Sequence, residues 1–204
     1  SFMAYVTHPE IRRLILQRYP TAKVYVLNEV GSAGPFPGPG IIRQSQKDFQ
    51  RKLKELGVDA VISGNGGCGL CTPKEVGSSI TAEYMGIPAV TIAASAFVTQ
   101  VISTAVNNGV AAPRTATYLG AFASHSRDEL IQNTRNVLWP QIVEALTKPI
   151  GAAEIAEHRK TAVSDNPKDI VFAGTVDEIN RHFCDMRWSD GLPIIPPTVA
   201  RVEE

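Results

Sequence analysis

Residues 58–97 read VDAVISGNGGCGLCTPKEVGSSITAEYMGIPAVTIAASAF and contain two short apolar runs on either side of a helical pattern. The runs at 58–63 and 87–94 have the length and apolar character of buried strands. Between them, apolar residues recur at four-residue spacing from Val76 to Tyr84, which predicts a helix. A strand, a helix and a second strand in this order predict a parallel β-α-β unit.

The same alternation continues on both sides of this unit. It predicts further strands over 22–27 and 115–121, and helices over 9–19, 46–57, 97–109 and 126–146. Ser126 and Glu129 form a capping-box pattern at the start of the last helix, and Pro140 is expected to kink or divide it. Strands alternating with helices predict an α/β fold over residues 1–150, with a flavodoxin-like parallel sheet and helices on both faces.

The character of the sequence changes in residues 151–204, which we interpret as a C-terminal extension. A short helix is expected over 151–161, a strand over 170–174, and a helix over 175–188 that is capped by Thr175 and Glu178. Several prolines rule out a regular helix over 189–204. We expect an extended arm there that packs on its own domain or on a partner subunit. A disordered terminus is the alternative.

Composition excludes several classes of protein. Twenty basic and twenty acidic residues cancel, which argues against nucleic-acid binding, because that function needs a concentrated basic surface. The chain has no run of about 18 apolar residues that would span a membrane. It also lacks the apolar core of a signal peptide, so we expect a cytoplasmic protein. In a reducing compartment, two closely spaced cysteines indicate catalysis, redox chemistry or metal binding more often than a structural disulfide. We expect no bound cofactor.

The loops after the predicted strands should form the site. In parallel α/β sheets, ligands bind beyond the carboxyl ends of the strands. The loops over 28–40, 64–71 and 94–97 are therefore expected to meet at one edge. His125 follows the fourth predicted strand, and pairing with a thiol is possible there, but we do not expect it. His8 and His158 are expected at the surface.

The second loop, GNGGCGLC (64–71), contains two cysteines three residues apart. Thr72 and Glu75 fit a capping box, so the cysteines should lie just before a helix N-terminus. Backbone N–H groups and the helix dipole favour a thiolate at that place. We therefore predict that Cys68 is a nucleophilic or redox-active residue and that Cys71 is its resolving partner. The residues predicted to bind substrate are Asn65, Gly66, Gly67, Gly69, Thr72 and Ser95.

Three other interpretations of the cysteines stay open. The first is that they are small residues packed in a tight turn. The second is half of a metal site, which His182 and Cys184 would have to complete, although two residues two positions apart on a helix do not share a face well. The third is a non-catalytic module that binds a small anionic molecule or a partner at the strand-end edge. Our site prediction itself includes no metal.

The stretch over 58–97 resembles the UGSC family, and the resemblance covers most of residues 20–148. Members carry selenocysteine or cysteine, then glycine, serine and cysteine, after a glycine-rich strand end. Here the motif is Cys68-Gly69-Leu70-Cys71, followed downstream by Gly-Ile-Pro at 86–88. Leu70 replaces the family serine, which puts a role for a serine hydroxyl in doubt but leaves the thiol pair intact.

The resemblance implies a chemistry for Cys68, which aligns with the selenocysteine of relatives. More distantly, the family resembles the selenocysteine subunits of glycine and D-proline reductases. There, the selenol attacks carbon and a neighbouring cysteine bonds to it. The segment over 189–204 is similar to one that is found next to UGSC-like domains or fused with them, where it leads into a further domain. Since this chain stops there, the resemblance implies a partner subunit that is encoded separately. We expect a cysteine-based enzyme subunit that acts on a small, anionic or carbonyl-containing molecule, as an oxidoreductase or by lyase-like addition–elimination.

Overall fold

A computed structural model of the chain describes residues 4–38, 40–155, 170, 172–186 and 195. The chain divides into two compact units, Ser1–Ala162 and Val163–Glu204, and each is described by itself. In the ranges given above, no helix is both long and apolar enough to cross a lipid bilayer.

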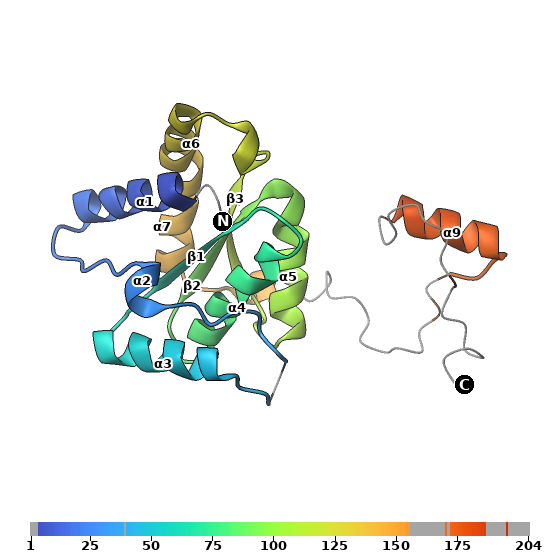
Figure 1. Cartoon of the computed structure of the whole chain (residues 1–204), viewed down its shortest axis with the longest axis horizontal. Coiled ribbons are helices and arrows are strands. Elements are labelled where there is room, and N and C mark those ends of the chain that lie inside the picture. The colour runs from blue at the N-terminus through green and yellow to red at the C-terminus, as the bar shows by residue number, and fades with distance from the viewer. Residues whose placement is uncertain (1–3, 39, 156–169, 171, 187–194, 196–204) are drawn as a thin grey trace. The chain divides into compact units, whose positions relative to one another are not determined.

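The first unit is built on a three-stranded parallel sheet in the order β1-β2-β3 (Figure 1). The strands are β1 (Val61–Gly66), β2 (Ala89–Ala94) and β3 (Arg114–Tyr118). β2 is the central strand and is buried along its whole length, as its apolar sequence requires. The mixed α/β class is confirmed, and the arrangement is consistent with a flavodoxin-like fold.

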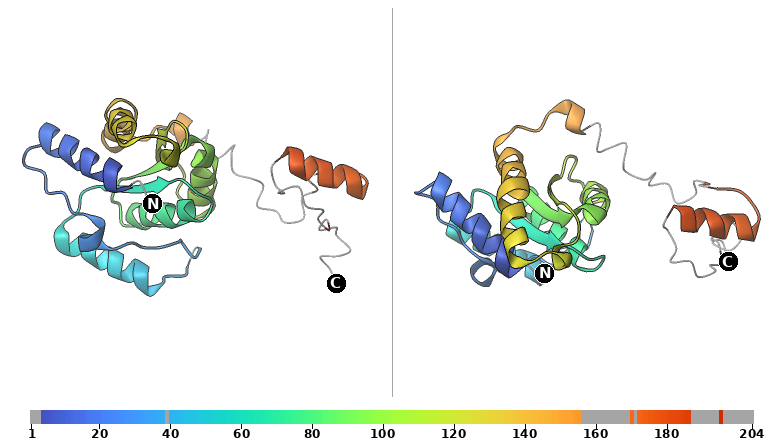
Figure 2. Two further views of the ribbon diagram at one scale, coloured as in Figure 1. Left: turned by 45° about the horizontal axis from the view of Figure 1, so that its top comes forward. Right: turned by 90° about the horizontal axis from the view of Figure 1, so that it is seen from above.

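Helices cover both faces of this sheet (Figures 1 and 2). One face carries α3 (Gln44–Leu56), α4 (Cys71–Glu83) and α5 (Val98–Asn107). The other carries α1 (Ala4–Arg18), α6 (Arg127–Asn133), a π-helical turn (Thr134–Leu138) and α7 (Trp139–Thr147). Short helical segments are α2 (Leu27–Val30), η1 (Ser95–Phe97) and η2 (Phe122–Ser124). The chain therefore buries apolar side chains on both sides of the sheet, and the loops at the strand ends remain at its edge.

The predicted strand over 22–27 is wrong. Residues 22–26 form no ladder with β1 and are exposed or half-buried, and Leu27 already begins α2 with 64 % of its surface exposed. The Glu29 carboxylate accepts a hydrogen bond from the Val26 amide at 2.8 Å. This bond caps α2 and ends the extended segment. The apolar, β-branched residues here therefore have no second surface to pack against.

The helical region after β3 follows its prediction closely. Ser126 and Glu129 form the expected capping box, with the Ser126 amide 2.7 Å from the Glu129 carboxylate. The interruption of the helix begins before Pro140, in the π-helical turn Thr134–Leu138, and Pro140 stands in the first turn of α7. Because proline has no N–H to donate, a local change in the hydrogen-bond pattern accommodates it there.

In the second unit, the helix predicted over 175–188 is α9 (Val176–Asp185), with the expected capping box of Thr175 and Glu178. The strand predicted over 170–174 is wrong for residues 170 and 172–174, which form no strand.

Of the helix predicted over 151–161, residues 152–155 are helical, residue 151 is not, and the remainder lies outside the described residues. The arm over 189–204, apart from Ile195, and His158 also lie outside them.

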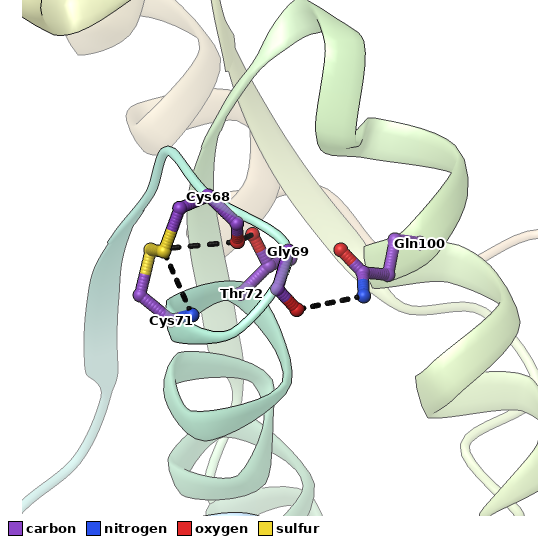
Figure 3. Close-up of a disulfide and its surroundings, with 5 residues drawn as sticks. All are labelled: Cys68, Gly69, Cys71, Thr72 and Gln100. Atoms are coloured by element: carbon purple, nitrogen blue, oxygen red, sulfur yellow. Dashed lines mark hydrogen bonds between the residues drawn. A yellow bond between two sulfur atoms is a disulfide. The ribbon is translucent and has the colours of Figure 1, made fainter. Parts of the chain in front are cut away.

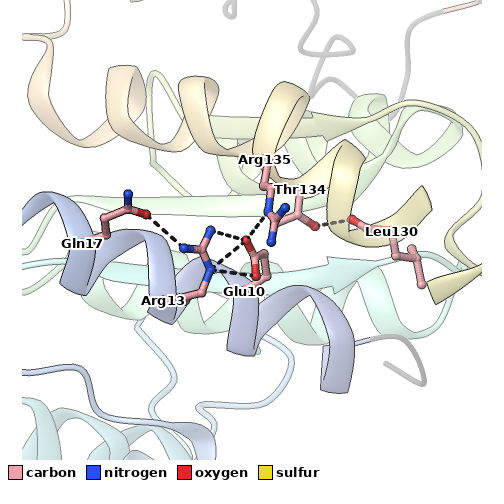
Figure 4. Close-up of polar contacts among 6 residues, drawn as sticks. All are labelled: Glu10, Arg13, Gln17, Leu130, Thr134 and Arg135. Carbon is pink, nitrogen blue, oxygen red and sulfur yellow. Dashed lines mark hydrogen bonds and ion pairs between the residues drawn. The ribbon is translucent and has the colours of Figure 1, made fainter. Parts of the chain in front are cut away.

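A buried carboxylate connects the helices on one face of the sheet (Figure 4). Glu10 of α1 is only 8 % exposed, and it accepts hydrogen bonds from Arg13 at 2.7 Å and from Arg135 of the π-helical turn at 2.6 Å. The hydrogen bond from Arg13 is the main cause that lowers the pKa of Glu10 from 4.5 to about 2, and Arg135 contributes in the same direction. Glu10 therefore stays charged at neutral pH and holds α1 against the π-helical turn.

Candidate functional site

The two cysteines lie at the carboxyl end of the sheet, between the end of β1 and the start of α4 (Figure 3). Their Cα atoms are 5.4 Å apart and their sulfur atoms are joined as a disulfide. The Cα separation lies within the usual range for disulfides, so the backbone can bring the two sulfur atoms together without rearrangement. Cys68 is exposed, and Leu70 between the cysteines is 87 % exposed. The cysteine pair is therefore reachable from solvent.

Cys68 occupies the place of a helix-capping residue. The Cys71 amide, three residues on, donates to Cys68 Sγ at 3.0 Å, and the Thr72 amide donates to the Cys68 carbonyl oxygen at 3.1 Å. A capping serine or aspartate side chain accepts from the same amide, three residues on. The positive end of the α4 dipole therefore lies at Cys68 Sγ.

The predicted capping box of Thr72 and Glu75 is wrong. Thr72 lies inside the first turn of α4, and its hydroxyl donates to the Cys68 carbonyl at 2.8 Å instead of accepting an amide. The reason is that Leu70 already has helical backbone angles, so the helix begins two residues earlier than the pattern indicated. Thr72 is fully buried, and its hydrogen bond to the Cys68 carbonyl ties the cysteine loop to α4.

We expect the Thr72→Val substitution to lower the free energy of unfolding by about 1 kcal/mol, because it deletes a buried hydrogen bond and keeps the shape of the side chain. Urea denaturation of the reduced chain measures this. Thr72→Ser, which retains the hydroxyl, is the matched control and should lose only the burial of one methyl group, about 0.8 kcal/mol or less. A loss in Thr72→Ser with none in Thr72→Val would show that the methyl group, and not the hydrogen bond, stabilises the loop.

The predicted binding residues divide into two groups. Gly67 and Gly69 are exposed next to Cys68. Asn65 and Gly66 instead belong to β1 and are buried. Gly64 and Asn65 together stand opposite one residue of β2, which is the pattern of a β-bulge.

Within the bulge, Asn65 points into the protein. It is completely buried, and its side-chain amide donates to the Thr7 hydroxyl of α1 at 2.9 Å. Thr7 Oγ1 in turn lies 3.3 Å from Asn65 Oδ1. Asn65 therefore supports the loop from inside the protein.

The other strand-end loops meet the cysteine loop in part. Gln100 of α5 donates to the Gly69 carbonyl at 3.1 Å (Figure 3). Ser95 is exposed at the end of β2, and the Gly120 amide after β3 donates to its hydroxyl at 3.4 Å. The loops that follow β2 and β3 are thus joined at the same edge.

The first predicted loop, over 28–40, departs from this expectation. It crosses the middle of α4, where a Cβ at Gly77 would overlap the Gly34 carbonyl oxygen. Phe36 then stacks on Tyr84, just past the last turn of α4, with ring centroids 5.5 Å apart. The loop therefore runs away from the cysteines, toward the amino ends of the strands.

Two titratable residues near the site differ from what the sequence suggested. His8 was expected at the surface, but its Nε2 atom is buried and has no hydrogen-bond partner within the described residues. Burial lowers the pKa of His8, and hydrogen bonds with Asn65 and Gly64 partly oppose this. Glu75 lies one turn after Cys71, and burial raises its pKa. Because α1 is only weakly amphipathic, the pattern of its sequence did not indicate that His8 faces inward.

Two further features lie away from the cysteines. A hollow of about 230 Å³ is located at the opposite end of α4. It is lined by Glu83, Tyr84, Gly109, Val110, Ala111, Ala112, Ile150 and Ile155. Among the residues that the structure describes, no group of three or more His, Cys, Asp or Glu side chains could hold a metal ion. Cys184 is exposed on α9 of the second unit.

Comparison with known proteins gives one match. A family model described as the UGSC family matches residues 10–148, which include the whole sheet and the cysteine loop. No curated protein and no solved structure matches the chain.

Proposed function

The chain belongs to the UGSC family, and from this premise we propose that it is a thiol-dependent enzyme subunit in which Cys68 is the nucleophile and Cys71 its partner. The observation that carries the proposal is the hydrogen bond from the Cys71 amide to Cys68 Sγ at 3.0 Å, at the N-terminus of α4. An exposed sulfur with this donor and this dipole is suited to react as a thiolate near neutral pH.

The proposed substrate is a small anionic or carbonyl-containing molecule. Exposed glycines on both sides of Cys68 leave room for such a molecule to approach the backbone. Gly67 and Gly69 have no side chains that would cover the sulfur, and backbone amides of a glycine-rich turn suit an oxygen of the substrate. Ser95 and Thr72 are proposed to complete the site, Ser95 from the loop after β2 and Thr72 by holding the cysteine loop.

Two courses of reaction are open to this pair of thiols. In the redox course, the Cys68 thiolate bonds to an electrophilic carbon and expels a leaving group. Cys71 Sγ then bonds to Cys68 Sγ, the carbon departs with the electron pair and takes up a proton, and an external dithiol reduces the resulting disulfide. In the addition–elimination course, Cys68 adds to carbon and leaves again without oxidation. The Cα separation of 5.4 Å supports the redox course.

We also propose that the chain acts in a hetero-oligomer with a separately encoded subunit in the cytoplasm. This part of the proposal rests on the resemblance of the C-terminal segment to one that is found next to UGSC-like domains or fused with them. Size-exclusion chromatography of the native complex, followed by identification of any second chain, would test it. A chain that purifies from its source alone would contradict it.

The reactivity of Cys68 tests the proposed nucleophile. In the reduced chain at pH 7, we expect iodoacetamide to modify Cys68 about tenfold faster than the exposed Cys184, because only Cys68 receives the amide and the positive end of a helix dipole. Peptide mass spectrometry after timed quenching measures both rates in one sample. Without reductant, the chain should be lighter by the two thiol hydrogens and Cys68 should be protected. If Cys68 reacts no faster than Cys184, the proposed function is wrong.

A further inference from the structure

Three side chains at the carboxyl end of β3 form a hydrogen-bonded chain that the two cysteines do not use. Asn133 Nδ2 donates to Tyr118 Oη at 3.1 Å, and Tyr118 Oη lies 2.7 Å from His125 Nδ1. An amide nitrogen can only donate, so the single proton of the Tyr118 hydroxyl is directed to His125. His125 Nδ1 therefore accepts a hydrogen bond, and the neutral imidazole carries its own proton on Nε2.

The surroundings of Tyr118 keep this arrangement in place. Tyr118 is completely buried, and the ring of Phe122 stacks on it with centroids 4.2 Å apart. Burial is the main cause that raises the pKa of Tyr118. The hydrogen bond from Asn133 opposes this, and the negative charge of Glu129 adds to it. The phenol consequently keeps its proton at neutral pH and remains a donor to His125.

The same residues lie against the cysteine loop. A Cβ added to Gly67, the residue before Cys68, would be 3.2 Å from the Phe122 ring. On its other side, Phe122 stacks on Tyr118, the partner of His125. The His125 ring itself lies beside Gly120, where an added Cβ would be 3.5 Å from Cε1. His125 and Cys68 therefore stand at the same strand-end edge.

The remaining nitrogen of His125 is available to a ligand. In the described part of the chain, His125 Nε2 has no hydrogen-bond partner, and it is not a buried atom. The titratable groups that face it are Tyr118, on β3, and Glu129, on α6, whose pKa is lowered chiefly by its hydrogen bonds with Ser126. The ring thus presents its Nε2–H donor to solvent, at the same strand-end edge as Cys68.

We propose that His125 Nε2–H donates a hydrogen bond to the carbonyl oxygen of the substrate whose carbon Cys68 attacks, so that the substrate is a carbonyl compound. This inference rests on the proposed function of Cys68. As the bond from Cys68 Sγ to carbon forms, the electron pair of the broken π bond moves to the oxygen. Nε2–H stabilises the negative charge that develops there.

Two probes of different chemistry test this role in the full, reduced chain with Cys184→Ala. Acrylamide adds to a thiolate so that charge collects on its carbonyl oxygen, and a proton from water completes the adduct and leaves hydroxide. Methyl methanethiosulfonate transfers its methylthio group and releases sulfinate, without a carbonyl. We expect His125→Ala to slow the reaction of Cys68 with acrylamide about tenfold. Its reaction with methyl methanethiosulfonate should change by less than about twofold, because the thiolate itself is stabilised by α4.

Two further variants separate this role from simple packing. His125→Gln keeps a donor near the position of Nε2 and should recover at least about half of the acrylamide rate. Asn133→Asp has the same shape, but its carboxylate accepts the Tyr118 proton, so Tyr118 must accept from His125 and the ring proton moves to Nδ1. We expect this variant to slow acrylamide addition about as much as His125→Ala does. The ¹⁵N spectrum of the histidine rings should report the change of tautomer.

The outcomes are distinguishable. If Cys68 reacts with both probes and His125→Ala slows neither, or slows both equally, the role of His125 is wrong while the thiolate function stands. The role is also wrong if the wild-type ring carries its proton on Nδ1. If Cys68 of the wild type reacts with neither probe, the proposed function and the role of His125 are both wrong.

Discussion

The Gly64→Ala substitution should lower the free energy of unfolding by about 3 kcal/mol or more, enough to remove a large part of the stability of a domain of this size. Gly64 lies in the bulge of β1 with φ +143°, a conformation that residues with a side chain rarely adopt. An added Cβ would lie 2.7 Å from Ile92 Cβ and 2.8 Å from the Ile92 carbonyl oxygen. Ile92 is completely buried in the central strand, so neither neighbour can move aside cheaply.

Urea denaturation followed by circular dichroism measures this loss, and Gly151→Ala is the matched control. A Cβ at Gly151 meets nothing within 4 Å, and the residue is exposed. We expect that control to stay within about 0.5 kcal/mol of the wild type. A Gly64→Ala chain as stable as the control would mean that β1 and β2 are not as closely packed as described. The cysteine loop would then lack its rigid support.

The Glu10→Gln substitution should destabilise the chain by about 2 kcal/mol at pH 7, and the difference from the wild type should vanish in acid (Figure 4). The pKa of Glu10 is lowered from 4.5 to about 2, which corresponds to at most about 3 kcal/mol. The side chains of Arg13 and Arg135 are 48 % and 41 % exposed, and solvent screening reduces the expected effect.

The sign of the pH dependence follows from the direction of this shift. A carboxylate whose pKa is lower in the folded state contributes its stabilisation fully above its ordinary pKa of 4.5. The contribution decreases as the pH falls from about 5 toward about 2, because Glu10 then takes up a proton and no longer offers a negative charge to the two arginines. Urea denaturation of wild type and Glu10→Gln at several pH values between 7 and 3 should show the two curves converging.

Glu55 of α3 offers a matched control for this experiment. It also pairs with two cations, Arg51 at 3.6 Å and Lys52 at 2.9 Å, but its side chain is 48 % exposed. Glu55→Gln should therefore change stability by less than about 0.5 kcal/mol. A difference between Glu10→Gln and the wild type that stays constant down to pH 3 would contradict the assignment of the low pKa to Glu10.

Much of the first unit could be predicted from the sequence because its core elements are locally consistent. The apolar runs that became β1, β2 and β3 are bounded by glycine and proline, and helices with clear spacing separate them. β1 ends three residues later than predicted because the bulge draws Gly64 and Asn65 into the strand. An apolar pattern does not reveal a bulge, since the residues that form it are polar or lack side chains.

The parts that were missed depend on tertiary contacts. Residues 22–27 have strand propensity, but without a pairing neighbour the segment stays exposed, because strand preference depends on burial. The role of Cys68 as a cap was obscured by Thr72 and Glu75, whose pattern placed the helix start two residues too late. Asn65 and His8 are turned inward by contacts between β1 and α1, which are far apart in the sequence.

The hydrogen bond from the Cys71 amide to Cys68 Sγ links the first turn of α4 to the chemical state of that sulfur. In the structure, the Cys71 amide donates to Cys68 Sγ while that sulfur is part of the disulfide. A thiolate at position 68 would be a stronger acceptor for the same amide, because hydrogen bonds to a charged acceptor are stronger. If Cys68 reacts as we propose, a covalent adduct on its sulfur would weaken the hydrogen bond from the Cys71 amide, and release of the adduct would restore it. Hydrogen exchange at the Cys71 amide would then report the chemical state of Cys68.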